Sequence, residues 1–102
     1  MDQALKRKWV RALRSGKYKQ ARDMLRNPKT GGMCCLGVLC HIQGARSAML
    51  DNYQETTLPR GFNAAIRPAE RRFLASKNDG GSSSGGIPHT FKQIADWIEK
   101  HL

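Results

Sequence analysis

Apolar residues recur at helical spacing near the start of the chain. Between residues 2 and 15 they fall at relative positions i, i+4, i+7 and i+8, which places them on one face of an α-helix. These residues are Leu5, Trp9, Ala12 and Leu13. Gly16 follows directly, and glycine often ends a helix because it adopts positive φ angles with little strain. The pattern predicts an amphipathic helix over residues 2–15.

Two shorter helices are expected in the next part of the chain. Residues 18–26 carry apolar side chains at helical spacing, and the sequence NPKTGG after them would end this helix. Residues 35–43 form an apolar run that fits a short buried helix, although a buried strand over residues 33–39 is an alternative. Gly37 lies inside this run and indicates that another stretch of backbone approaches closely.

The second half of the chain begins with a segment that has no clear period. Residues 45–66 indicate an extended connection or a small β-hairpin near residues 53–63. Pro68 then suits the first position of a helix, because that position needs no backbone N–H. The sequence PAERRFLASK predicts a helix there that buries Phe73 and Leu74.

The end of the chain carries the signals of a well-formed helix. Thr90 and Gln93 have the spacing of a capping box, in which each side chain accepts a hydrogen bond from the other's backbone N–H. An inward stripe follows, formed by Phe91, Ile94, Ala95 and Ile98. We expect a helix that runs to about Lys100, with Trp97 beside the stripe.

These segments predict a mainly α fold: one compact domain over residues 1–102 with about four to five short helices. A chain of this length has room for one small core. Residues 79–88 are rich in glycine and serine, and we expect a flexible loop there within the domain.

The net charge of the chain indicates which class of binding partner it favours. The chain has 18 Lys and Arg residues against 8 Asp and Glu, a net charge of +10. This excess favours polyanionic partners, although a basic protein need not bind one. Arg7, Arg11 and Arg14 fall opposite the apolar face of the first helix, and arginine suits bidentate contact with phosphate. The expected anion-binding residues are Arg7, Arg11, Arg14, Lys17, Lys19, Arg22 and Arg26.

The stretch TGGMCCLGVLCH raises the question of cysteine chemistry. Cys34, Cys35, Cys40 and His41 are zinc-ligand types, but no pair has the C-x-x-C spacing of a zinc site. Alternatively, Cys34 or Cys35 could be a nucleophile, with His41 or His89 as its base. Free cysteines usually act as small buried hydrophobic residues, and this is the interpretation that we favour. We therefore expect no metal, no cofactor and no catalytic residue.

The glycine-rich loop offers a second possible anion site. It leads into the N-terminus of the last helix, where free backbone N–H groups favour anions. The candidate residues there are Asn78, Asp79, His89 and Thr90. A plain connection between helices is the alternative, because the spacing of a P-loop is absent.

No apolar run is long enough to span a membrane, and the sequence MDQALKRKW lacks the apolar region of a signal peptide. We therefore expect a cytoplasmic protein with no membrane partner. A homodimer is possible, with Trp9, Trp97 and Phe62 lining either the core or a dimer contact.

The chain also resembles a family of small, functionally uncharacterised proteins of tailed bacteriophages and prophages. The resemblance rests on KWVRALRSGKYKQ, CCLGVLC, the Asn-Asp pair and FKQIADWIE, and it spans nearly the whole chain. The longer GGSSSGGIPH segment is a departure from that pattern. The resemblance implies an accessory gene product in the cytoplasm of a bacterial host, and it supplies no catalytic or binding residue.

Together these observations predict a binding protein rather than an enzyme, active in anti-defence or host takeover. Its basic surface would capture an anionic ligand, a nucleotide or oligonucleotide, or the acidic face of a host protein. Two alternatives remain open, a DNA- or RNA-binding protein and a cysteine-dependent hydrolase.

Overall fold

The computed structural model describes residues 1–51, 53–54, 58–81 and 85–102. Over these residues the chain forms five α-helices and one short 3₁₀ helix, η1, and three isolated β-bridges without a sheet. The helices are α1 (Gln3–Arg14), α2 (Cys35–Ile42), α3 (Ser47–Leu50), α4 (Pro68–Asp79) and α5 (Phe91–His101), with η1 (Asn63–Ala65) before α4. The expected mainly α domain is confirmed.

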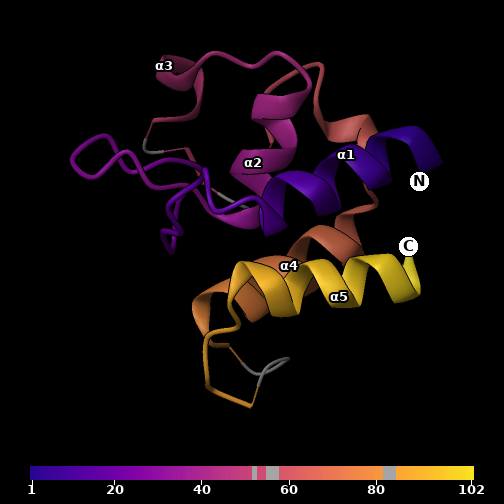
Figure 1. Cartoon of the computed structure of the whole chain (residues 1–102). Coiled ribbons are helices and arrows are strands. Elements are labelled where there is room, and N and C mark those ends of the chain that lie inside the picture. Colours follow the sequence, from indigo (N-terminus) through magenta and orange to yellow (C-terminus); the bar gives the residue numbers. More distant parts are fainter. Residues whose placement is uncertain (52, 55–57, 82–84) are drawn as a thin grey trace.

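The core forms where α2 packs against α1 and α4, and α5 packs against the same two helices. Figure 1 shows α1 and α5 side by side, with α2 above α1 and α4 beside α5. All six residues from Cys35 to Cys40 are buried. The indole N–H of Trp9 donates a hydrogen bond of 2.9 Å to the carbonyl of Cys35, so α1 is joined to the start of α2 inside the core.

Helix α1 starts and ends where the sequence predicts. The side chain of Asp2 accepts a hydrogen bond from the backbone N–H of Leu5, which satisfies one of the free donors in the first turn. Ser15 caps the other end, and Gly16 has a φ of 76°. Trp9 and Leu13 on the predicted apolar face are buried.

Helix α5 also follows its sequence signals. Thr90 and Gln93 form the expected capping box. The inward stripe is buried as predicted, since Phe91, Ile94, Ala95 and Ile98 are at most 7% exposed. In α4, Leu74 is buried and Phe73 is half-buried.

Residues 35–42 form a helix, so the strand alternative is wrong. Gly37 explains how α2 fits, because a Cβ atom added there would lie 2.1 Å from the carbonyl oxygen of Leu25. Only a residue without a side chain allows this contact between the helix and the preceding loop. The close approach predicted from Gly37 is confirmed.

The helix predicted over residues 18–26 is wrong. Tertiary hydrogen bonds replace helical ones: Ala21 donates to the carbonyl of Met33, and Leu25 donates to that of Tyr53. Asp23 has a φ of 69°, a left-handed conformation that interrupts a helix. Leu25 is buried, which explains the apolar spacing, but it enters the core from a loop.

The segment predicted to be extended contains two short helices, α3 and η1. The sequence predicts a hairpin within it near residues 53–63. None of the described residues of that range, 53–54 and 58–63, lies in a strand, and residues 55–57 lie outside the described part of the chain. The sequence predicts a flexible loop over residues 79–88, and residues 82–84 of that range lie outside the part of the chain that the structure describes.

Candidate anion-binding site

A groove of about 680 Å³ extends along α1 at its border with α5. Its lining residues are Gln3, Lys6, Arg7, Val10, Arg11, Arg14 and Ser15 of the N-terminal segment and Glu99 of α5. Four of these are cations and one is an acid. The three predicted arginines of the first helix, Arg7, Arg11 and Arg14, are therefore brought together in one concave surface.

The arginines of this groove are not equivalent. Arg14 forms salt bridges with Asp96, at 2.7 Å, and with Glu99. The hydrogen bonds that Arg14 donates to Asp96 and Glu99 raise the pKa of its guanidinium. Among the described residues, no carboxylate lies within ion-pair distance of Lys6, Arg7 or Arg11. The charges available to a ligand are thus those of Lys6, Arg7 and Arg11.

Arg11 also lines a second, smaller hollow on the other side of α1. Lys8 and Lys17 share this hollow with Arg11, and the half-buried ring of Tyr18 forms part of its wall. Lys17 therefore extends the basic surface beyond the groove, with Arg11 between the two hollows.

The remaining predicted cations lie apart from the groove. Lys19 and Arg22 line another hollow, together with Asp23 and Asn27. Arg26 pairs with Asp51, and both side chains are largely buried, at 23% and 28% exposure. The seven predicted anion-binding residues therefore do not form one continuous surface.

The loop residues predicted as a second anion site form hydrogen bonds with other parts of the protein. Asn78 is fully buried. Its side-chain oxygen accepts from Gln20 at 2.9 Å and from the backbone N–H of Cys35 at 3.3 Å. Its side-chain nitrogen donates to the carbonyl of Ala21 at 2.8 Å and to Asp79. No part of this amide reaches the surface to meet a ligand.

The neighbours of Asn78 have similar structural roles. The carboxylate of Asp79 accepts from the backbone N–H of Asp23 at 3.0 Å. The carbonyl of His89 accepts from Gln20, and Thr90 caps α5. The structure thus places these predicted site residues in contacts that hold the loop between Gly16 and Met33 against α4 and α5.

Gln20 has a central position that the sequence does not reveal. Its amide nitrogen donates to Asn78 and to the carbonyl of His89, and its oxygen accepts from the backbone N–H of Phe91 at 3.1 Å. One side chain therefore joins a loop, the end of α4 and the start of α5. A single glutamine in a polar segment has no pattern that would identify it.

The cysteines belong to the core. Cys34, Cys35 and Cys40 are buried and have no exposed surface. The sulfur of Cys34 accepts a hydrogen bond from the backbone N–H of Gly37 at the start of α2. Burial raises the pKa of Cys40 from its ordinary value of 9.0 to about 12, which disfavours the nucleophilic thiolate. The buried, hydrophobic interpretation of these residues is confirmed.

The described residues contain no group of three or more His, Cys, Asp or Glu side chains that could hold a metal ion. The ring of His41 packs edge-on against Tyr18, with ring centres 5.6 Å apart.

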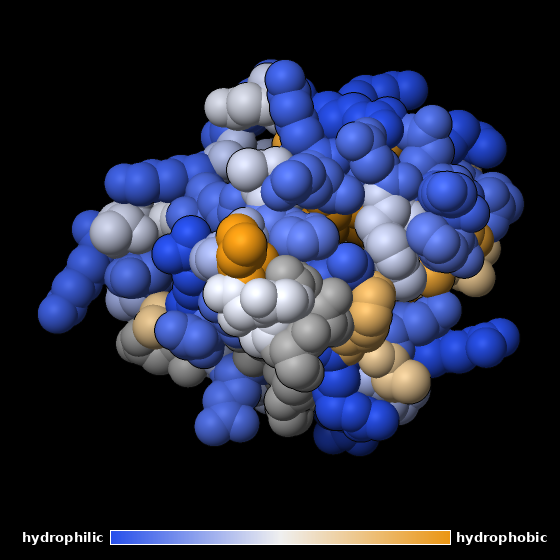
Figure 2. All heavy atoms as spheres, turned by 90° about the horizontal axis from the view of Figure 1, so that it is seen from below, coloured by the Kyte–Doolittle hydropathy of each residue, from blue (hydrophilic) through white to orange (hydrophobic). Residues whose placement is uncertain are grey.

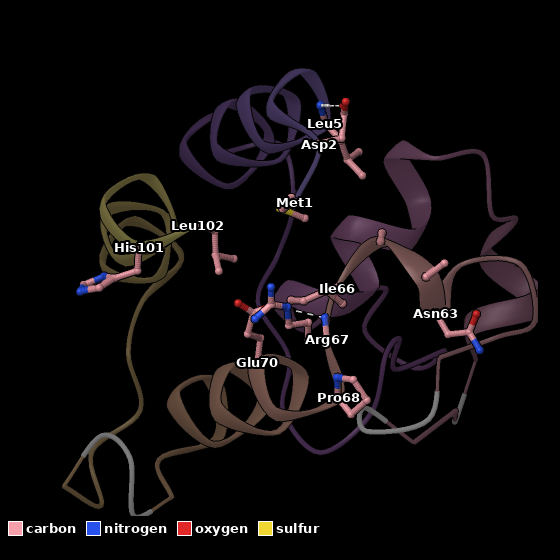
Figure 3. A pocket seen from close by; sticks show the side chains of 12 residues that line it. Met1, Asp2, Leu5, Asn63, Ile66, Arg67, Pro68, Glu70, His101 and Leu102 are labelled. Atoms are coloured by element: carbon pink, nitrogen blue, oxygen red, sulfur yellow. Dashed lines mark hydrogen bonds between the residues drawn. The ribbon is translucent and has the colours of Figure 1, made fainter.

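A further hollow, of about 720 Å³, lies between the start of α1, the start of α4 and the end of α5 (Figure 3). Its acids have structural roles, because Asp2 caps α1 and Glu70 accepts a hydrogen bond from the backbone N–H of Arg67. Its charges are mixed in sign, with Arg67 beside these acids, so it attracts anions less than the α1 groove does.

Among the described residues, the exposed large apolar side chains are Met49, Tyr53 and Ile87. Figure 2 shows separate hydrophobic spots on a largely hydrophilic face. Trp9 is fully buried, so it lies in the core and not in a dimer contact, while Trp97 and Phe62 are half-buried. In the described part of the chain, no helix has both the length and the apolar character needed to span a membrane.

The chain was compared with protein families, with curated proteins and with solved structures. The comparison with curated proteins found no match, and neither did the comparison with solved structures. A family model described as "Domain of unknown function (DUF8296)" matches residues 1–58, more than half of the chain. The match includes α1 and the cysteine-containing helix α2. The chain therefore belongs to the DUF8296 family.

Proposed function

We propose that this protein acts by binding an anionic partner in the groove along α1, and not by catalysis. The observation that carries the proposal is the set of three cations, Lys6, Arg7 and Arg11, gathered in one concave surface with no acid paired to them among the described residues. A cation without a local counter-ion keeps its full attraction for an external anion.

The surroundings of these cations favour a preformed site. They extend from a capped helix whose opposite face is fixed in the core by Trp9 and Leu13. Arg14 is held against α5 by Asp96 and Glu99, which fixes one wall of the groove. An anion that binds here needs to order only the side chains that contact it, and this limits the entropic cost of binding.

In the setting that the phage resemblance implies, such binding would sequester a bacterial nucleotide signal or block an acidic or nucleic-acid partner. We propose anti-defence or host takeover in the bacterial cytoplasm as that role.

Titration of ¹⁵N-labelled protein with three probes, ATP, a hexaglutamate peptide and a short DNA duplex, tests the proposal by NMR. We expect at least one probe to shift the amide signals of residues 6–15 in a saturable manner. Arg7→Ala with Arg11→Ala should weaken that binding about 30-fold, because each arginine contributes about 1 kcal/mol at an exposed site. Both positions are exposed in a helix, where alanine is well tolerated.

A matched control removes the same charge elsewhere. Arg46→Ala with Arg72→Ala also takes away two exposed arginines, but neither lies in the groove. This double variant should bind within about twofold of the parent protein. The proposal is wrong if no probe shifts the groove signals, or if both double variants lose affinity equally, since equal loss would indicate only the overall charge.

A further inference from the structure

We infer that the ligand of the α1 groove is a nucleic-acid duplex, contacted through its phosphate backbone without reading of base sequence. This inference rests on the proposed function and specifies the class of ligand.

The first argument is the spacing of the charges. Residues in an α-helix rise about 1.5 Å each, so Arg7 and Arg11 are offset by roughly 6 Å along α1. Each strand of a duplex carries one phosphate per roughly 3.4 Å of its axis. The offset therefore corresponds to about two phosphates of one strand. A duplex continues this spacing of phosphates beyond the two arginines, whereas the phosphates of a mononucleotide end after at most three.

The second argument is the continuation of the basic surface. Arg11 lines both the groove and the neighbouring hollow, where Lys8 and Lys17 lie. A ligand that contacts Arg7 and Lys17 must cross α1 over Arg11. An extended polyanion can follow this path, whereas a compact anion would fill only one hollow.

The third argument is the absence of a ring on which a base could stack. No aromatic residue lines the groove, and its apolar floor is the largely buried Val10. In the neighbouring hollow, the ring of Tyr18 contacts His41. Proteins that bind single strands use exposed aromatic rings as stacking platforms. A duplex keeps its bases stacked inside and presents phosphates outward, which suits a groove that offers cations and no aromatic ring among its described residues.

The packing of α1 determines the mode of contact. A recognition helix must protrude to enter the major groove, but α1 is packed against both α2 and α5 (Figure 1). Its exposed cations can therefore meet the phosphate ridge but not the base edges. Asp96 and Glu99 lie beside Arg14, and their charge repels phosphates, so the duplex should cross nearer to Lys6 and Arg11.

Fluorescence anisotropy with labelled duplexes of about 20 base pairs tests this inference. We expect two duplexes of unrelated sequence to bind within about twofold of each other, and the corresponding single strands to bind more weakly. Three phosphate contacts give a slope of about −2.7 for log K against log salt concentration. Binding should therefore weaken roughly 40-fold between about 50 and 200 mM salt.

The arginine variants measure the contribution of the groove. Arg7→Ala with Arg11→Ala should reduce the magnitude of the slope by about two, since two phosphate contacts are lost. Arg46→Ala with Arg72→Ala should leave the slope unchanged. An unchanged slope in the groove variant would overturn the inference.

Other outcomes separate the inference from the proposed function. If ATP or hexaglutamate binds in the groove and the duplex does not, the duplex inference fails and anion binding stands. If single strands bind more tightly than duplexes, or one sequence is preferred more than tenfold, backbone recognition of a duplex is refuted. If no probe binds, both proposals fail.

Discussion

Replacing Gly37 by alanine tests how tightly α2 is packed against the loop before it. The added Cβ atom would lie 2.1 Å from the carbonyl oxygen of Leu25 and 2.9 Å from its carbonyl carbon. Both are backbone atoms, so no side-chain rotation can relieve the overlap. Either α2 or the segment around Leu25 must move.

The expected loss of stability follows from what this movement disturbs. The carbonyl of Leu25 accepts a hydrogen bond from Cys34, worth about 1 kcal/mol in the folded protein. Overpacking a core adds about 1–3 kcal/mol. Alanine is better than glycine in a helix by about 1 kcal/mol, and this partly offsets the loss. The free energy of unfolding should therefore fall by about 1–3 kcal/mol.

Thermal unfolding followed by circular dichroism measures the effect. For a domain of about 100 residues, the Tm should fall by about 5–20 °C. Gly16→Ala is a suitable control, because it has a φ of 76° and no atom within 4 Å of the added Cβ. It should cost only the strain of a left-handed alanine, about 1–2 kcal/mol. A Gly37→Ala variant as stable as the parent protein would refute the close packing inferred here.

Three further predictions concern the buried polar and thiol groups. Asn78→Ala should lower the free energy of unfolding by about 2–4 kcal/mol in urea denaturation, because the part-buried Ala21 carbonyl and the buried Cys35 N–H lose the hydrogen bonds that Asn78 makes with them. Replacement of the exposed Asn63 by alanine should change it by less than about 0.5 kcal/mol. All three thiols should react with a disulfide reagent only after unfolding, and rapid labelling of the native protein would contradict their burial. Stability should fall as the pH rises above about 9, because the Cys40 pKa is 9.0 when exposed and about 12 in the fold, so the unfolded chain loses that proton first. Cys40→Ala should make this decrease less steep by up to about 1.4 kcal/mol per pH unit, and equal slopes would show that Cys40 is not the cause.

The sequence predicts best those elements whose stabilising contacts are local. The N-terminal ends of α1 and α5 are determined by Asp2 and by the Thr90–Gln93 pair. Each of these residues lies within three residues of its hydrogen-bond partner. The apolar stripes of these helices repeat at the helical period, so pattern and structure agree. Gly37 is a different case, because its conformational cost in a helix indicates a tertiary contact before that contact is known.

The loop over residues 18–26 could not be predicted in this way. Its apolar spacing is compatible with a helix, and its true conformation depends on partners distant in sequence. Leu25 donates to Tyr53, and Gln20 contacts Asn78 and His89, which are 58 and 69 residues away. No local signal identifies these partners, since an isolated glutamine or asparagine resembles any other polar surface residue.

The same distant contacts determine the limits of the proposed site. As a helix, residues 18–26 would present Lys19, Arg22 and Arg26 on a regular surface like that of α1. The contacts of Gln20 with Asn78 instead hold this segment in an irregular path, and Arg26 turns inward to Asp51. Charge pattern alone therefore overestimates the site, because uncharged residues decide which cations lie together. Only the cations on α1, whose helix is encoded locally, could be placed correctly from sequence.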